Sequence, residues 1–557
     1  MSVAGSVPVP AGTGHDPHPT GAGRDPLGRA ARHGALGLVG AVSAGASGFL
    51  LTLVVGRVLG KHDVGVFFTA VAVFTILNQV LLLGSDTGLV RSLPGLSATG
   101  CWERIRPTIV AALLPVAAAS ATVAVVGFVA AGPLARAALD PEVSGDLERA
   151  LRLLAPFLVL STLSTLLLNG VSRGLGAMRT FTLGQQILLP AGRPVAVAVA
   201  VLLGAGATGA LLGWALPLLA VSAMAVHEVR RLLRRVPRHG TGPAGPDGVP
   251  EGGGRTGGVS RAAVRAVGGP FWRLTAPRGL AAGFEILIVW SDVVLVTVLY
   301  GPAEAGIYAA ASRFVTSGTM ALQALRLAIG PLLAASFSRG DLAEAARVHR
   351  FSAQWAILTT WPVYLALGLF APAVLSLLGD GFSPACGALG ILSAAMLGVV
   401  ATGNANTVLN MAGRSNWAAV NTGIAATVML VVDLLLIPGH GMAGAAVGWA
   451  AAMLTDSSLG VWEIRRGLRV ASFDRGTARA ALLALGGFGL PAAAWVLLVP
   501  EGPLSGSLVG LFLGAGAATG IYCLLLFRYR RELGVAELVA GVRGKGRDGA
   551  ARGGAGQ

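Results

Sequence analysis

Residues 279–301 read GLAAGFEILIVWSDVVLVTVLYG, an apolar run interrupted by two acids, Glu285 and Asp292. A helix needs about 20 such residues to cross the roughly 30 Å hydrocarbon core of a bilayer, so this run predicts a transmembrane helix. Similar runs recur along the 557 residues, of which 54% are hydrophobic and 12% charged, with a mean hydropathy of +0.71. This composition is not that of a soluble globular protein and predicts an all-α polytopic membrane protein.

We expect about fourteen transmembrane helices. Their approximate ranges are 35–58, 64–88, 107–131, 151–171, 180–204, 207–228, 279–300, 305–335, 352–378, 384–409, 416–437, 441–462, 477–499 and 504–527. The Gly/Pro-rich stretch 237–269 separates the first six from the next six and is typical of a flexible linker. The expected fold is therefore two six-helix bundles around a central cavity, followed by two additional helices.

The turns before the second helix of each bundle look alike. VLGKHDVGVFFTA (58–70) aligns at a constant offset with LYGPAEAGIYAAA (299–311), so that Gly60 matches Gly301 and Gly65 matches Gly306. Tight turns favour glycine and acids in any case, which is the alternative explanation. If the match reflects a repeat, two halves of the same orientation imply a pseudo-two-fold axis along the membrane normal.

The distribution of arginines predicts the topology. Even-numbered connections between the expected helices are basic and odd-numbered ones mostly acidic, which places both termini in the cytoplasm and the chain in the cytoplasmic membrane. The expected domain order is a disordered tail at 1–32, a first bundle at 33–229, a flexible cytoplasmic linker at 230–270, a second bundle at 271–465, two further helices at 466–527 and a basic tail at 528–557.

The net charge of +16 does not point to nucleic acid, because the arginines lie between apolar runs and no nucleic-acid-binding motif is present. The three cysteines, Cys101, Cys386 and Cys523, are isolated from one another, so we expect neither a metal site nor a disulfide. No nucleotide-binding loop of the GxxxxGK[ST] type occurs, and no cofactor is expected.

Three patches carry a family resemblance. They are GRVLGKHDVGVFFTA (56–70) with GSDTGLVRSL (84–93), SDVVLVTVLYGPAEAGIYAAASRF (291–314) with GPLLAASFSRGD (330–341), and LLLIPGHGMAGAAVGWA (434–450). Through them the chain resembles the O-antigen-type polysaccharide flippases of the multidrug/oligosaccharidyl-lipid/polysaccharide (MOP) exporter superfamily. The resemblance implies two bundles forming a V around a cavity, and a lipid-linked oligosaccharide as substrate. In the lipid II flippases of that superfamily an arginine of span eight faces the cavity, which implies the same position for Arg313.

Arginines within the apolar runs are the candidate headgroup ligands. A guanidinium can hold a phosphate through two parallel hydrogen bonds, so Arg313, Arg193 and Arg326 are candidates for binding the phosphate of a lipid-linked sugar. Trp290 is a candidate for stacking on a sugar ring. The alternatives are an internal Arg–Asp pair for Arg313 and Arg193, and an interfacial position for Arg326.

Buried acids are the candidate coupling sites. Without a nucleotide site, transport would draw on an ion gradient or the membrane potential, so Asp292, Glu285 and Asp433 are candidate proton or sodium sites. Pairing with Arg313 is the alternative for Asp292. The asparagines of span ten, Asn404 and Asn406 among them, are more typical of contacts between helices than of sugar binding.

The leading function is therefore a flippase that moves a polyprenyl-phosphate-linked glycan across the cytoplasmic membrane by alternating access. A glycan polymerase or glycosyltransferases would be its partners. Alternatives are a cation-coupled multidrug exporter, a lipid II flippase, and a scaffold that has lost transport. A membrane enzyme is disfavoured because no long outside loop carries catalytic residues.

Overall fold

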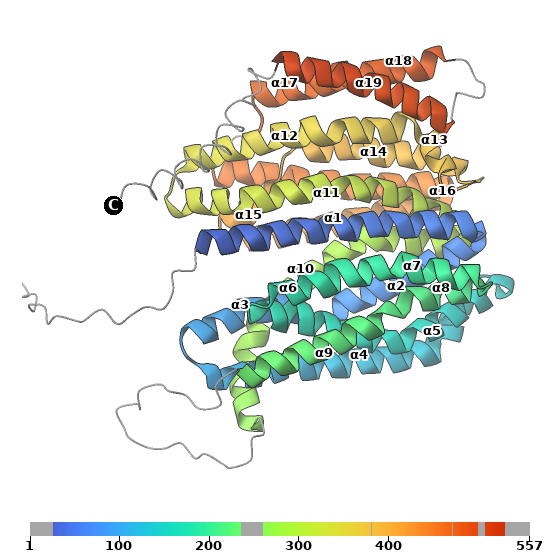
Figure 1. The fold of residues 1–557 in the computed structure, drawn as a ribbon. Coiled ribbons are helices and arrows are strands. Elements are labelled where there is room, and N and C mark those ends of the chain that lie inside the picture. Colours follow the sequence, from blue (N-terminus) through green and yellow to red (C-terminus); the bar gives the residue numbers. More distant parts are fainter. Residues whose placement is uncertain (1–25, 236–259, 380, 471, 500–506, 530–557) are drawn as a thin grey trace, which may run out of the picture.

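The computed structural model describes residues 26–235, 260–379, 381–470, 472–499 and 507–529. Within these ranges the chain is helical and contains no strand, which confirms the expected all-α class. Figure 1 shows two groups of helices side by side with a further group stacked on the second. We call the first two groups the first lobe and the second lobe.

The first lobe contains the helices of the first half of the chain. They are α1 (Pro26–Val58), α2 (Lys61–Leu81), α3 (Ser85–Ala98), α4 (Trp102–Ala138), α5 (Pro141–Thr165), η1 (Leu166–Ser172), α6 (Met178–Phe181), η2 (Thr182–Leu188), α7 (Leu189–Leu202), α8 (Gly206–Ala215) and α9 (Pro217–Arg235). The segments η1 and η2 are π-helical, a wider winding that often occurs at functional sites.

The second lobe follows residues 236–259, which lie outside the described part of the chain. Its helices are α10 (Arg261–Tyr300), α11 (Pro302–Ser338), α12 (Leu342–Leu369), α13 (Ala371–Ser376), η3 (Ser383–Ala385), α14 (Cys386–Ala401), α15 (Ala405–Met411) and α16 (Ser415–Gly467). The additional helices are α17 (Arg475–Ala484), η4 (Leu485–Gly489), α18 (Leu490–Leu498) and α19 (Leu508–Tyr529). They pack on α12 and α13, where the Tyr522 hydroxyl donates to the Leu358 carbonyl at 2.7 Å.

Within the described residues, 11 helical segments are long and apolar enough to cross a membrane. One of them, α16, is two helices joined at Gly441, whose φ of 53° and ψ of −130° are not helical. Only glycine adopts that conformation readily, so the chain reverses there and the two halves pack as a hairpin. The count of fourteen spans stays a prediction.

The helices extend into ranges that the sequence assigns to tails and linker. α1 begins at Pro26, inside the expected tail at 1–32, and α9 and α10 both enter the expected linker at 230–270. The Ser260 side chain accepts a hydrogen bond from the Ala263 amide, which is the usual way in which a serine begins a helix. The boundaries predicted from glycine and proline content therefore fall inside helices α1, α9 and α10.

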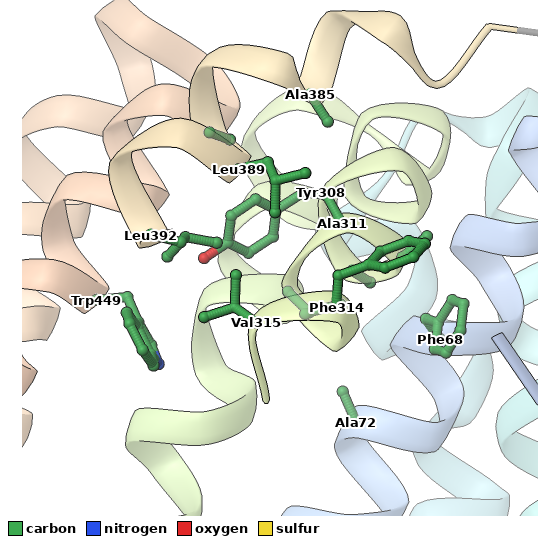
Figure 2. Close-up of a cluster of buried hydrophobic side chains, with 14 of the residues drawn as sticks. Phe68, Ala72, Tyr308, Ala311, Phe314, Val315, Ala385, Leu389, Leu392 and Trp449 are labelled. Carbon is green, nitrogen blue, oxygen red and sulfur yellow. The ribbon is translucent and has the colours of Figure 1, made fainter. Parts of the chain in front are cut away.

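The lobes meet along α1 and α2 on one side and α10 and α11 on the other. Figure 2 shows α11 at the centre of this packing: Phe314 points toward Phe68 of α2, while Tyr308 and Val315 lie among Leu389, Leu392 and Trp449 of α14 and α16. Phe314 also makes an edge-to-face contact with Phe49 of α1, with ring centroids 5.1 Å apart. Aromatic pairs of this geometry add to the burial of apolar surface.

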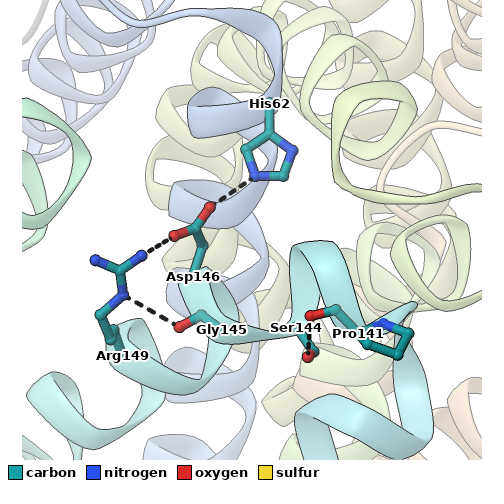
Figure 3. Close-up of polar contacts among 6 residues, drawn as sticks. All are labelled: His62, Pro141, Ser144, Gly145, Asp146 and Arg149. Atoms are coloured by element: carbon teal, nitrogen blue, oxygen red, sulfur yellow. Dashed lines mark hydrogen bonds and ion pairs between the residues drawn. The ribbon is translucent and has the colours of Figure 1, made fainter.

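The two ends of the bundle differ. We call the end with the α1–α2 and α10–α11 turns the outer end, following the expected topology, and the opposite one the inner end. At the outer end the Arg57 side chain donates to the Leu377 carbonyl of the other lobe at 2.7 Å. Figure 3 shows Asp146 of α5 between His62 of α2, at 3.1 Å, and Arg149 of α5. These contacts tie the turns of the outer end together.

Candidate functional site

The α10–α11 hairpin brings Asp292 and Tyr308 together. The two residues are at equal sequence distances from Tyr300, where α10 ends, so the reversal of the chain sets them side by side. The Tyr308 hydroxyl donates to Asp292 Oδ2 at 2.6 Å, and the Val293 amide donates to Oδ1 at 2.7 Å. Asp292 is 2% exposed, so this carboxyl is held inside the second lobe by two hydrogen bonds.

Asp433 of α16 completes what we call the acid cluster, formed by Asp292, Tyr308 and Asp433. Asp433 is fully buried and interacts electrostatically with both other members. Neither of its carboxylate oxygens has a hydrogen-bond partner within the described chain. A side chain at Gly448 would lie only 1.9 Å from Asp433 Oδ1, so the glycine makes room for the acid. An unpartnered buried carboxyl is costly, which marks this site as one where a cation or proton would be stabilised.

Arg313 lies next to the acid cluster but stacks on an indole. Its guanidinium carbon is 3.8 Å from the centroid of the Trp290 ring, a cation–π contact between α11 and α10. Its Nε is buried without a hydrogen-bond partner, and none of the ion pairs in the described residues involves Arg313. The attraction to Asp292 is therefore a longer-range one.

Arg193 makes the same arrangement in the first lobe. Its guanidinium carbon is 3.8 Å from the centroid of Trp214 of α8, and its Nε is also buried without a partner. Trp214 packs edge-on against Phe74 of α2, with centroids 5.2 Å apart. Arg193 and Arg313 thus each lie on a tryptophan face, and neither belongs to an ion pair among the described residues.

A second polar group, which we call the inner cluster, consists of Glu285, Arg326 and Asp456. Arg326 Nε donates to Asn404 Oδ1 at 2.9 Å, and Asp456 accepts from Asn406 at 2.6 Å and from Thr422 at 3.1 Å. Glu285 interacts electrostatically with both charged partners. Arg326 is exposed and interacts electrostatically with both acids of the inner cluster.

The two clusters occupy different depths. At 1.5 Å per residue, Asp292 lies about 12 Å along α10 from its outer end and Glu285 about 22 Å. Although both acids belong to one face of the helix, Asp292 is buried among α11 and α16, whereas Glu285 is exposed. The acid cluster and Arg313 form an outer tier, and the inner cluster forms a tier about 10 Å closer to the inner end.

Sequence reasoning found most of these residues but not their partners. The alternative of an Asp292–Arg313 ion pair is not what the structure shows, because each side chain has a different neighbour. Trp290, a candidate for stacking on a sugar ring, stacks on the Arg313 guanidinium in this structure. Tyr308 and Trp214 were not among the candidate residues. The first could have been found from the symmetry of the hairpin about Tyr300.

Two apolar grooves flank α10. One, of about 780 Å³, lies between α10 and the first half of α16, and the other, of about 390 Å³, lies between α10 and α2. Phe284, next to Glu285, borders both grooves. Within the described residues, no group of three or more His, Cys, Asp or Glu side chains could hold a metal ion.

The chain is similar to solved structures of membrane transporters. It matches an inward-facing multidrug resistance MATE family transporter of the MOP superfamily with a TM-score of 0.62 at 14% identity, covering 77% of this chain and 95% of that one. It matches the lipid II flippase MurJ in an inward closed conformation with a TM-score of 0.67 at 9% identity, covering 89% and 99%. The fold is that of the MOP superfamily transporters.

A third match is a MOP superfamily transporter from Pyrococcus furiosus, with a TM-score of 0.55 at 15% identity, covering 81% of this chain and 96% of that one. That transporter is described as having a binding pocket of reverse polarity, which suggests a different function for it. No protein-family model and no curated protein matches the chain.

Proposed function

We propose that this protein is a flippase that moves a polyprenyl-phosphate-linked oligosaccharide across the cytoplasmic membrane by alternating access of its two lobes. The observation that carries the proposal is the pair of arginines, Arg313 and Arg193, that stack on tryptophans without an ion-pair partner in the described residues. A permanent charge inside a bilayer is costly and normally serves a function. An anionic headgroup supplies the missing counter-charge.

The chemistry of the stack suits a phosphate. The indole face holds the guanidinium plane and leaves its N–H edge available, and that edge can donate two parallel hydrogen bonds to a phosphate or diphosphate. When the headgroup leaves, the cation–π contact with Trp290 still stabilises Arg313. The site can therefore be filled and emptied without leaving a bare charge in the membrane, which a transport cycle requires.

The acid cluster supplies the coupling step of the proposed cycle. A proton or sodium ion bound between Asp292 and Asp433 would cancel one of their two negative charges and so relieve the repulsion between the two carboxyls. Arg313 lies close enough to sense this change electrostatically. Occupation of the acid cluster would therefore change how strongly Arg313 holds an anion, which links the ion to the headgroup. Glu285, in the inner cluster, would act at the inner end.

A cation-coupled multidrug exporter is the second candidate, and the unpartnered Asp433 is the observation that favours it, because a buried carboxyl can also bind a cationic drug. The two functions differ in the residue that touches the substrate. A flippase of anionic headgroups depends on Arg313, whereas an exporter of cations binds its drug at the acids.

The experiment uses the full chain in proteoliposomes that contain a fluorescent polyprenyl-diphosphate oligosaccharide, and a membrane-impermeant quencher reports its movement between leaflets. We expect Arg313→Ala to lower the rate at least tenfold, Arg313→Lys to retain part of it, and the exposed control Arg339→Ala to match the unaltered protein. Melting temperatures in detergent verify that each variant is folded.

Two outcomes would contradict the proposal. One is a flipping rate no greater than that of protein-free vesicles. The other is an Arg313→Ala variant that flips the lipid normally. Accumulation of ethidium that depends on Asp433 and not on Arg313 would establish the exporter instead.

A further inference from the structure

A groove of about 860 Å³ runs along α9, outside both clusters of the proposed transport site. Its wall changes character along the helix. Leu160 of α5 and Leu219 and Val226 of α9 line the part nearer the membrane centre, and four arginines with His227 line the part nearer the inner end. An apolar slot that opens into a basic rim has the polarity of a phospholipid.

The basic rim has little counter-charge of its own. Arg231 pairs with Glu228 at 3.5 Å, whereas Arg230, Arg234 and Arg235 are exposed and belong to none of the ion pairs in the described residues. These three side chains also lie in the last turns of α9, where the helix dipole leaves the carbonyl end negative and favours cations. The three guanidiniums therefore gather at one helix end, where no carboxylate of the described residues pairs with them.

The groove also contains a buried polar atom without a partner. Ser222 lines the groove, is 8% exposed, and its hydroxyl has no hydrogen-bond partner within the described chain. Buried hydroxyls in proteins are nearly always hydrogen-bonded, so an unsatisfied one next to a groove points to a missing ligand. The end of α9 itself is fixed, because Arg106 of α4 donates to the Leu233 carbonyl at 3.0 Å.

The position of the groove separates it from the proposed substrate path. α9 packs against α5, α7 and α8 and the two π-helical segments, all in the first lobe. Figure 1 shows α9 and α4 on the side of the first lobe that faces away from α12 and α14 of the second lobe. A molecule in this groove would contact the first lobe and the surrounding bilayer.

We propose that this groove is a binding site for an anionic phospholipid of the leaflet at the inner end. The lipid phosphate lies between Arg230, Arg234 and Arg235, and an acyl chain follows the apolar wall past Leu219. Basic pockets at this level of a membrane protein attract anionic headgroups, at about 1 kcal/mol for each charge near the surface. Because the apolar wall continues from the basic rim, a lipid satisfies the groove better than a free phosphate. The site is independent of the proposed function.

The test measures binding of dioleoyl-phosphatidylglycerol to the purified full chain in neutral detergent by native mass spectrometry, with dioleoyl-phosphatidylcholine as the neutral lipid. Combined Arg230→Gln, Arg234→Gln and Arg235→Gln changes should weaken phosphatidylglycerol binding on the order of a hundredfold, given about 1 kcal/mol for each of the three charges near a membrane surface. The matched control removes three exposed arginines at the same end of the second lobe, Arg339→Gln, Arg347→Gln and Arg465→Gln, and should leave binding unchanged.

A second variant tests the acyl chain separately from the charge. Ala223→Trp fills the apolar wall and keeps all four arginines. It should weaken phosphatidylglycerol binding while leaving the weak binding of sn-glycerol-1-phosphate, the headgroup without chains, unaltered. Bound lipid also raises the melting temperature of the native protein, so the same variants should lose the stabilisation that phosphatidylglycerol confers.

Three results would overturn the inference. Equal loss of binding in the control triple variant would show a general effect of net charge. No effect of Ala223→Trp, together with equal affinity for glycerol phosphate and the lipid, would show a free-anion site. Unchanged phosphatidylglycerol binding in the Arg230/Arg234/Arg235 variant, with a normal melting temperature, would place the lipid elsewhere.

Discussion

Gly65 of α2 and Gly306 of α11 lie in direct backbone contact at the outer end, and they occupy equivalent positions in the two similar turns of the chain. A Cβ atom at Gly306 would lie 2.5 Å from the Gly65 amide nitrogen, and one at Gly65 would lie 1.6 Å from the Pro302 carbonyl oxygen. Small residues allow helices in membranes to approach this closely. The glycine that the two similar turns share therefore contacts its equivalent in the other turn, at the outer-end contact between the lobes. Further along α2, the Thr69 hydroxyl is 2.6 Å from the hydroxyl of Thr297 of α10.

Adding one methyl group at this contact should open the outer end. We expect Gly65→Ala to separate α2 from α11, because the new Cβ would overlap backbone atoms that have no rotamer to change. A cysteine at Thr297, buried in the closed form, should then react several times faster with a membrane-impermeant maleimide added from outside, in a background with the three native cysteines replaced by serine.

Gly60→Ala is the matched control, since a Cβ at Gly60 meets nothing within 4 Å. It should leave labelling of the Thr297 cysteine at the level of the parent protein. Equal labelling in the Gly65 and Gly60 variants would mean that the glycine contact does not hold the lobes closed.

The hydroxyl of Tyr308 should matter for ion binding as well as for stability. Tyr308→Phe removes the 2.6 Å hydrogen bond to the buried Asp292, which we expect to lower the free energy of unfolding by about 1–3 kcal/mol. It should also weaken the dependence of transport on a proton or sodium gradient, because Asp292 is one of the two carboxyls proposed to bind the ion. Thermal unfolding and transport at varied gradient measure the two effects.

Tyr522→Phe separates these effects. Tyr522 is also buried and donates one hydrogen bond, of 2.7 Å, to the Leu358 carbonyl, far from the acid cluster. Its loss should cost a similar free energy of unfolding and leave the ion dependence as it was. If both phenylalanine variants change the gradient dependence alike, the effect comes from lowered stability and not from Asp292.

The comparison of Tyr308 with Arg313 shows what the sequence could predict. The equal spacing of Asp292 and Tyr308 from the α10–α11 turn follows from the hairpin, so a reader of the sequence can infer that they meet. The rotation of α11 about its own axis is harder to infer, because helices that face lipid on one side and protein on the other are apolar all round. The sequence therefore did not predict that Arg313 stacks on Trp290.

The same limitation applies to Asp433. Its burial was expected from its place in an apolar run, but its lack of a partner depends on Gly448, which approaches from the other half of α16. The all-α membrane fold, in contrast, followed from the apolar runs. Contacts between the apolar runs were predictable only across tight turns, as for Asp292 and Tyr308.

Removing the half-buried Asp456 and the buried Asp433 should have different effects on stability. Asp456 accepts hydrogen bonds from Asn406 and Thr422, so Asp456→Ala should lower the free energy of unfolding by about 1.5–3 kcal/mol, the range for hydrogen bonds to a charged group. Asp433 has no partner in the described chain, so Asp433→Asn should leave the stability of the ion-free protein unchanged or raise it.

Melting temperatures with and without sodium, at several pH values, measure this contrast. Asp433→Asn should also abolish any sodium- or proton-dependent rise in melting temperature that the parent protein shows. A large loss of stability in Asp433→Asn under ion-free conditions would show that this carboxyl has a structural partner, and would remove it from the proposed coupling site.

The reversal at Gly441 should be the most sensitive single backbone position of α16. Its two halves align Asn421 with Glu463, joined by a 2.7 Å hydrogen bond, and Asp433 with Gly448, so the polar contacts of the second lobe depend on where the chain turns. At φ 53° and ψ −130°, an L-residue is strained even though a Cβ at Gly441 would make only ordinary contacts with Tyr300. Gly441→Ala should therefore cost about 1–3 kcal/mol of unfolding free energy, from the backbone alone.

Gly439→Ala, two residues earlier and with nothing within 4 Å of its Cβ, should cost far less and serves as the control. Thermal unfolding of the two alanine variants decides the matter: identical melting temperatures would mean that the turn does not require the glycine conformation.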